Sequence, residues 1–187
     1  MNTSYTFKKS AFEKILHWEL TDNGLSFKQE GKTDALIPYQ YISTIRMQYK
    51  PFRYRTYNYS CIISTGTSSV ELFSTSYEGF ANFSDLRETY TPFVKELVKT
   101  VQENNPNCII QVGQTSSVFY GTLALNIFLL FVLLRLIYFI PIQGSMSIVI
   151  KLVLVGYYFF YVVKSFKKNK PQQATSSEIP NEVLPSF

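Results

Sequence analysis

Chemically reactive side chains are scarce in this chain. Its 187 residues include one histidine and two cysteines, and these three residues, His17, Cys61 and Cys108, are far apart in the sequence. A zinc site needs several Cys or His ligands at close spacing, and the motifs of phosphate-binding loops, dinucleotide sites and nucleophilic serines are also missing. We therefore expect no metal, no cofactor and no enzymatic activity, and we interpret His17, next to Trp18, as a structural residue.

Charge is absent from a long part of the chain. Positions 104–134 contain no charged residue, and the next acidic residue after Glu103 is Glu178. Residues 1–103 hold 12 basic and 11 acidic side chains, whereas residues 104–187 hold six basic and two acidic ones. The basic surplus therefore belongs to the C-terminal part. A nucleic-acid-binding domain would carry such a surplus on its folded surface, so we expect no nucleic-acid partner.

Two apolar runs occupy the charge-poor part. Residues 118–140 are nearly all apolar, and a helix of this length measures about 34 Å, enough to cross a bilayer core of about 30 Å. A second run covers residues 147–163, and a short uncharged turn with Pro141 and Gly144 separates the two. A buried helical hairpin of a soluble protein is the alternative, but the charge-free stretch is longer than an ordinary core helix. The sequence predicts a transmembrane helical hairpin over residues 118–164.

Positive charge follows the second apolar run and is absent from the turn. Residues 164–170 contain four lysines, and such charges flank membrane spans on the cytoplasmic side. Two spans return the chain to its starting side, so we expect both termini in the cytoplasm. The sequence beyond the lysines is polar and contains prolines, which predicts a basic and then disordered cytoplasmic tail over residues 165–187.

Three polar residues interrupt the predicted spans, namely Asn126, Arg135 and Lys151. In an antiparallel hairpin Arg135 and Lys151 would lie at similar depth, and their long side chains could reach the outer headgroups. The alternative is a functional cationic pair that lines a pore or binds an anionic ligand in an oligomer. Asn126 could form hydrogen bonds between helices and support self-association.

The N-terminal part reads as strands followed by one helix. Segments rich in β-branched and aromatic residues between residues 15 and 75 predict five to seven short strands, and Asn23–Gly24 is a hairpin signal. From Leu86 to Val101 apolar residues recur every three or four positions, which predicts an amphipathic helix. Pro92 either kinks this helix or lies in the first turn of a helix that restarts at Thr91.

This order of elements predicts an α+β fold. We expect a PH-like antiparallel β-barrel or sheet capped by a C-terminal helix over residues 1–104, a linker over residues 105–117, and then the two-helix transmembrane hairpin. The linker contains the apolar stretch "CIIQV", which could be a short strand.

Four stretches carry a resemblance to a known family. They are Trp18–Leu25, Ile37–Arg46, Phe73–Tyr77 and Thr89–Leu97. Together they resemble bacterial PH-like (YcxB-like) domains over about residues 15–103. The resemblance implies the PH-like fold, a pair of membrane helices and a place in the bacterial cytoplasmic (inner) membrane. It implies no active site.

One local cluster could bind a partner. Residues 46–57 interleave basic and aromatic side chains, and no acidic residue occurs from Ala35 to Val70. Such a segment could lie on an anionic membrane surface, bind a protein or stack on bases, or it could be a solvated hairpin whose charges protect an edge strand. The candidate binding residues are Arg46, Tyr49, Lys50, Phe52, Arg53, Tyr54 and Arg55.

The sequence therefore predicts a non-catalytic, membrane-anchored PH-like module. The spans place it among membrane lipids, and the module would present a protein- or lipid-binding surface at the cytoplasmic face. The alternative is an oligomeric membrane effector or channel, with Asn126, Arg135 and Lys151 in the assembled helices and the PH-like domain as a sensor.

Overall fold

The computed structural model describes two compact units. The first unit comprises Met1–Gly113 and Gln172–Phe187, and the second comprises Gln114–Pro171. Across the described residues the chain is α+β, with several sheets and three α-helices. The structure describes all residues except 1–2, 32–33, 51–57, 140–144, 175–183 and 185–187.

Four antiparallel strands form the first sheet, in the order β1-β2-β3-β4. The predicted Asn-Gly hairpin joins β2 to β3, with Thr21 opposite Gly24. A Cβ atom on Gly24 would lie 2.4 Å from the carbonyl oxygen of Ile37. Glycine is therefore required for β4 to approach the turn this closely. The strands are β1 Ser4–Phe7, β2 Leu16–Thr21, β3 Gly24–Gln29 and β4 Ala35–Ile37.

The second sheet has the order β11-β10-β5-β6-β7. Its pairs are antiparallel, except that β10 runs parallel to β5. Strands β5, β6 and β7 fall within the predicted strand segments, whereas β10 falls in the predicted linker and β11 in the predicted tail. The strands are β5 Ile42–Tyr49, β6 Tyr59–Thr65, β7 Ser69–Phe73, β10 Ile109–Val112 and β11 Gln172–Gln173.

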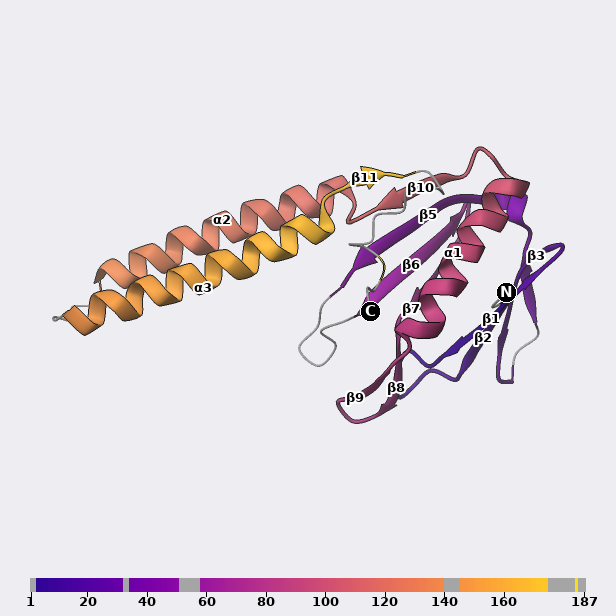
Figure 1. The fold of residues 1–187 in the computed structure, drawn as a ribbon, viewed down its shortest axis with the longest axis horizontal. Coiled ribbons are helices and arrows are strands. Elements are labelled where there is room, and N and C mark those ends of the chain that lie inside the picture. The colour runs from indigo at the N-terminus through magenta and orange to yellow at the C-terminus, as the bar shows by residue number, and fades with distance from the viewer. Residues whose placement is uncertain (1–2, 32–33, 51–57, 140–144, 175–183, 185–187) are drawn as a thin grey trace. The chain divides into compact units, whose positions relative to one another are not determined.

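A small two-stranded sheet connects the larger ones. β8 continues from β7 through Ser74 and lies beside β1 (Figure 1). The backbone N–H of Tyr77 donates to the carbonyl oxygen of Lys8 at 2.8 Å, and the N–H of Lys8 donates to Oγ of Ser76 at 3.0 Å. The elements are β8 Thr75–Gly79, β9 Asn82–Asp85 and the 3-10 helix η1 Tyr39–Tyr41, which joins β4 to β5.

The helix α1, Arg87–Asn104, buries one apolar face in the core of the first unit. The predicted stripe is confirmed: the buried apolar residues of α1 are Tyr90, Phe93, Val94, Leu97, Val98 and Val101. The helix is continuous through Pro92, so the alternative of a restart at Thr91 is wrong.

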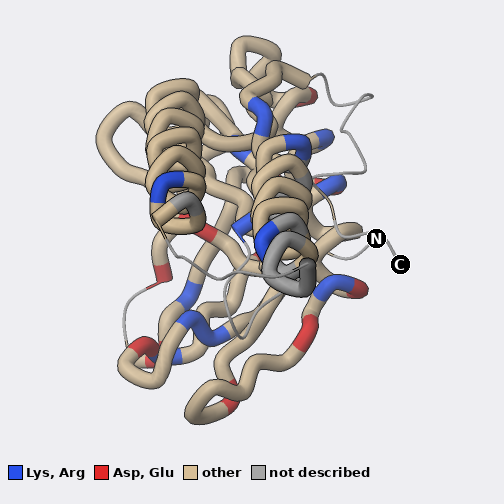
Figure 2. Tube along the Cα trace, turned by 90° about the vertical axis from the view of Figure 1, so that its left-hand side faces the viewer, with Lys and Arg blue, Asp and Glu red and all other residues tan. Residues whose placement is uncertain are grey.

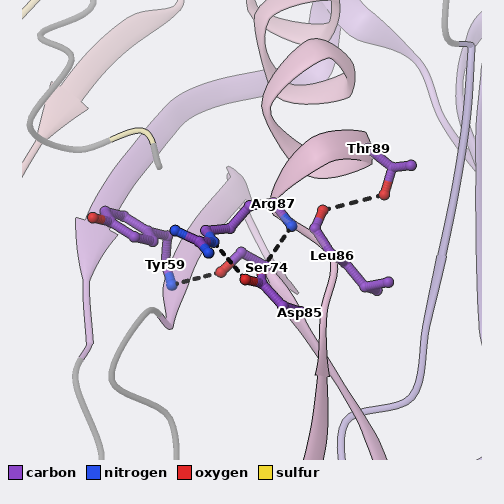
Figure 3. Close-up of polar contacts among 6 residues, drawn as sticks. All are labelled: Tyr59, Ser74, Asp85, Leu86, Arg87 and Thr89. Carbon is purple, nitrogen blue, oxygen red and sulfur yellow. Dashed lines mark hydrogen bonds and ion pairs between the residues drawn. The ribbon is translucent and has the colours of Figure 1, made fainter. Parts of the chain in front are cut away.

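Hydrogen bonds fix the start of α1 (Figure 3). The carboxylate of Asp85 accepts from the backbone N–H of Arg87 at 3.0 Å and from its guanidinium Nε at 2.6 Å. Ser74 accepts twice: its Oγ from the N–H of Tyr59 and its carbonyl oxygen from the N–H of Leu86, both at 2.9 Å. One buried serine thus holds together strand β6, the bend between β7 and β8, and the start of the helix.

Aromatic rings make up much of this core. The ring of Tyr5 lies 5.5 Å from Phe93 and 5.8 Å from Tyr90, between centroids. Trp18 stacks on Phe27 at 4.9 Å. Offset and edge-to-face pairs of this kind add stability beyond the area they bury. Tyr5 belongs to β1, a strand that the sequence analysis did not predict, so the first strand supplies a central part of the core.

The C-terminal segment differs from the predicted tail. α3 continues to Asn169, and β11 then pairs with β10, with Gln172 opposite Val112. The backbone N–H of Ala174 donates to the carbonyl oxygen of Ile110 at 3.0 Å, and Leu184 is 2% exposed within the core of the first unit. The prediction of a disordered tail is therefore wrong for Gln172–Ala174 and Leu184. These residues form backbone hydrogen bonds and apolar contacts with distant segments, and the polar composition of the tail does not indicate such contacts.

Two long helices form the second unit. They are α2, Ser116–Phe139, and α3, Ser145–Asn169, close to the predicted spans 118–140 and 147–163. The segment Ser116–Ile137 is long and apolar enough to cross a membrane, with a mean hydropathy of 2.2 and none of its most apolar window buried; among the described residues, one helix meets this criterion. Charged positions are few along both helices and none is acidic (Figure 2).

Candidate functional site

The basic and aromatic segment predicted to bind a partner is described in part. Arg46 and Tyr49 lie on β5, and Lys50 follows that strand. The remaining candidates, Phe52, Arg53, Tyr54 and Arg55, lie outside the described residues.

Arg46 is held between two strands of the second sheet. It is opposite Gln111 of β10, and its guanidinium donates a hydrogen bond to the side-chain oxygen of that residue. Burial lowers the pKa of Arg46. The ordinary pKa of an arginine side chain is so far above neutral pH that the guanidinium group stays charged. Because its partner Gln111 is a neutral amide, no acidic side chain among the described residues compensates the positive charge.

Lys50 and Tyr49 are engaged within the first unit. The ammonium group of Lys50 forms an ion pair with the carboxylate of Glu71 on β7. The ring of Tyr49 packs on that of Tyr59, with centroids 5.2 Å apart. The ion pair is partly exposed and therefore contributes little stability. It does neutralise Lys50, which is one of the two basic residues described in this segment. Of these three candidates, Arg46 keeps a charge without an acidic partner among the described residues.

Asn126, one of the three polar residues predicted within the spans, has definite hydrogen-bond partners. The hydroxyl of Tyr158 on α3 donates to the side-chain oxygen of Asn126 on α2 at 3.1 Å, and the amide nitrogen of Asn126 donates to the carbonyl oxygen of Thr122 at 2.8 Å. Phe119 and Phe166 meet edge to face at 5.2 Å. These contacts define an antiparallel pair of helices, and Asn126 forms its interhelical hydrogen bond within one chain.

The register of the helix pair places Arg135 and Lys151 at about the same level. Counting from the contact between Asn126 and Tyr158, Arg135 faces a position two residues before Lys151, about 3 Å along the axis. The guanidinium carbon of Arg135 lies 5.7 Å from the ring centroid of Phe131, one turn toward the start of α2. That geometry is a cation–π contact. Whether either cation reaches headgroups or serves an assembly stays a prediction.

Two cavities lined by described residues were not predicted from the sequence. An apolar groove of about 300 Å³ lies between α2 and α3, and Asn126, Tyr158 and Lys167 are among its lining residues. A polar cavity of about 260 Å³ lies in the first unit between the β2–β3 turn, η1 and α1. Asp22 and Glu96 both line the polar cavity, so its chemistry suits a cationic or hydrogen-bonding group. No local sequence signal indicates this cavity, because the two acids are 74 positions apart.

The histidine, cysteine and acidic side chains of the described residues do not form a metal site. Among the described residues no three His, Cys, Asp or Glu side chains are placed to hold a metal ion. Nδ1 of His17 lies 2.6 Å from the hydroxyl of Thr6, its partner across β1 and β2. Cys61 is fully buried, and burial raises the pKa of its thiol to about 12. A thiol with that pKa is protonated at neutral pH and is a poor nucleophile.

Two phenylalanines of the first unit, Phe12 and Phe80, are each 99% exposed. Phe12 belongs to the connection between β1 and β2, and Phe80 to the turn between β8 and β9. The sequence analysis missed them because it did not predict β1, β8 or β9.

Comparison with protein families, curated proteins and solved structures finds no match to this chain.

Proposed function

We propose that the chain is a non-catalytic, membrane-anchored PH-like module. In this proposal the two long helices are transmembrane spans, the first unit is cytoplasmic, and its surface binds an anionic lipid or a protein partner. Anchoring raises the local concentration of the module at the membrane, so even a weak binding surface meets its partner often.

The observation that carries the proposal is the apolar surface of α2. Ser116–Ile137 has a mean hydropathy of 2.2 and its most apolar window is not buried by the rest of the chain. Such a surface is costly in water at about 25 cal/mol per Å², and a lipid bilayer removes that cost. The second span is supported by α3, which has 25 residues and packs on α2 through Tyr158 and Phe166.

The order of elements in the first unit supports the PH-like part of the proposal. The 3-10 helix η1 joins the first sheet to the second, the continuous β7–β8 segment leads from the second sheet to the small sheet beside β1, and α1 follows the strands and covers the core. Binding would use Arg46 together with the neighbouring segment 50–55, and Lys50 would first have to leave Glu71.

The oligomeric effector is the weaker alternative. It assigns Asn126 to an assembly, whereas this side chain already has a hydrogen-bond partner on α3 of the same chain. A monomer found by light scattering in detergent would exclude the assembly.

The anchoring proposal is tested by fractionation of full-length chain. We expect it to remain with membranes after extraction at alkaline pH and to float with vesicles. Single cysteines placed at Thr67 and in the C-terminal segment should be labelled from the cytoplasmic side. Recovery of the full chain from the aqueous fraction without detergent would overturn the proposal.

A further inference from the structure

The first unit exposes two large apolar side chains completely, Phe12 and Phe80. The other large apolar residues of the described part of this unit that are strongly exposed are between 46% and 63% accessible: Ile15, Leu36, Tyr41 and Ile109. A phenylalanine at 99% exposure gains nothing from packing within the chain. Folding therefore gives no reason for a phenyl ring at either position.

The two rings belong to the same end of the first unit. β1 contacts β8, and Lys8, which directly follows β1, forms hydrogen bonds with Ser76 and Tyr77 of β8. The C-terminal ends of β1 and β8 lead into the two loops that carry the rings, and Figure 1 shows the β8–β9 hairpin projecting beside β1 and β2.

The turn that carries Phe80 is unfavourable on local grounds. Gly79 pairs with Asn82, so Phe80 and Ala81 form a two-residue turn. Ala81 has a φ of 56°, in the left-handed region that Gly and Asn adopt more easily. Positions that break a local rule without a packing gain are concentrated at functional sites.

The connection that carries Phe12 is rich in basic side chains. Lys8, Lys9 and Lys14 lie in the connection that carries Phe12, and they outnumber the acids of the two loops, Glu13 and Glu78. The ammonium groups of Lys8 and Lys9 lie 5.7 Å and 5.8 Å from the rings of Tyr77 and Phe73. Lys9 also forms an ion pair with Glu13 at 3.7 Å. Lys8 and Lys14 therefore give the connection that carries Phe12 a net positive charge.

We propose that the tips at Phe12 and Phe80 insert into the headgroup region of a bilayer that contains anionic lipids. The inference rests on the proposed membrane anchoring and adds a second membrane contact, made by the first unit itself. Isolated rings on separate loops suit a bilayer interface, where aromatic side chains sit at headgroup depth. A protein interface would need a continuous apolar surface around the rings, and Ile15 is the one further strongly exposed large apolar residue described in these loops.

The test uses full-length chain in lipid nanodiscs, labelled with bimane at Ala11→Cys. Native Cys61 and Cys108 are buried and should not react. Thr67→Cys, in the exposed turn between β6 and β7, is the matched control. Nitroxide on the lipid headgroups of discs with anionic lipid should quench bimane at position 11 much more than at position 67. The substitutions Phe12→Ser and Phe80→Ser together should abolish that difference, and replacing anionic with zwitterionic lipid should reduce it.

Equal quenching at positions 11 and 67, with the chain embedded in the discs, would overturn the inference while leaving the anchoring intact. Failure of the chain to enter discs would instead contradict the proposed function. A nitroxide at position 11 that shows dipolar broadening between copies would mean that the tips meet a second chain, which would also overturn the lipid assignment.

Discussion

At the scale of single residues, Ser74 is the point where three elements of the first unit meet. Its side chain is fully buried, and its Oγ satisfies the backbone N–H of Tyr59. Removing the hydroxyl leaves that N–H without its partner in a buried position.

We expect Ser74→Ala to lower the free energy of unfolding by about 1–3 kcal/mol. The measurement is urea unfolding in detergent, followed by the fluorescence of Trp18, the single tryptophan, which lies in the core. Thr67→Ala, which removes a hydroxyl at an exposed turn, is the control and should change little. Equal stability of the two variants would contradict the role assigned to Ser74.

Cys61 gives a prediction for alkaline pH. Its folded pKa of about 12 lies above the ordinary value of 9.0, because burial penalises the thiolate. A raised pKa means that the folded state holds the proton more tightly than the unfolded state does. The stability that this group contributes is therefore complete below pH 9 and is lost as the pH rises toward 12.

We expect the midpoint of thermal unfolding to fall steadily above about pH 9, in the range where the Cys61 thiol titrates in the unfolded chain. The same burial should keep Cys61 unreactive toward a maleimide at about pH 8 until the chain unfolds. Burial also raises the pKa of Tyr90, which acts in the same direction at higher pH. Rapid labelling of Cys61 in the folded chain would show that the side chain is accessible.

At the scale of elements, the C-terminal segment completes the first unit. β11 pairs with β10, and Leu184 is buried in the core. We expect Leu184→Ala to destabilise the first unit by about 2–5 kcal/mol, the usual cost of truncating a buried leucine. Leu36→Ala, at a side chain about half exposed, is the matched control and should cost much less. Thermal unfolding followed by Trp18 fluorescence distinguishes the two.

The sequence predicted the elements whose signal is local. The hairpin at Asn23–Gly24, strands β5 to β7, the stripe of α1 and both long helices follow from turn chemistry and periodicity over a few residues. Strands β1 and β11 were not predicted, and the sequence left open whether the "CIIQV" stretch that contains β10 is a strand, because each is short and its pairing is decided by distant segments. The C-terminal segment is an example. The stretch "PQQA" is polar, yet its backbone forms hydrogen bonds with β10.

The candidate site was harder to predict than the fold. The sequence identified the basic character of residues 46–50, but it could not show that Lys50 meets Glu71 or that Arg46 meets Gln111, because these partners are 21 and 65 positions away. The exposed Phe12 and Phe80 escaped detection for a related reason: exposure is a property of the folded surface, and a phenylalanine is ordinarily expected in the core.

At the scale of the whole molecule, the anchoring depends on the apolar character of α2. We expect Ile127→Lys, at an exposed position of that helix, to disfavour membrane insertion by about 3 kcal/mol, as for other charges near the centre of a span. Ser117→Lys, at the start of the helix, should have little effect because its side chain can reach the interface. The effect of each substitution is measured as the fraction of the chain that stays in membranes after alkaline extraction. Full retention of Ile127→Lys would contradict a bilayer location for α2.

The pairing of β10 with β11 has a consequence for engineering this molecule. Val112 and Gln172 are directly opposite each other in an antiparallel ladder, so everything between them is an insertion into what is otherwise a β-hairpin. Excising the helices and closing the gap with an Asn-Gly turn should leave a water-soluble globule that keeps all strands of both large sheets.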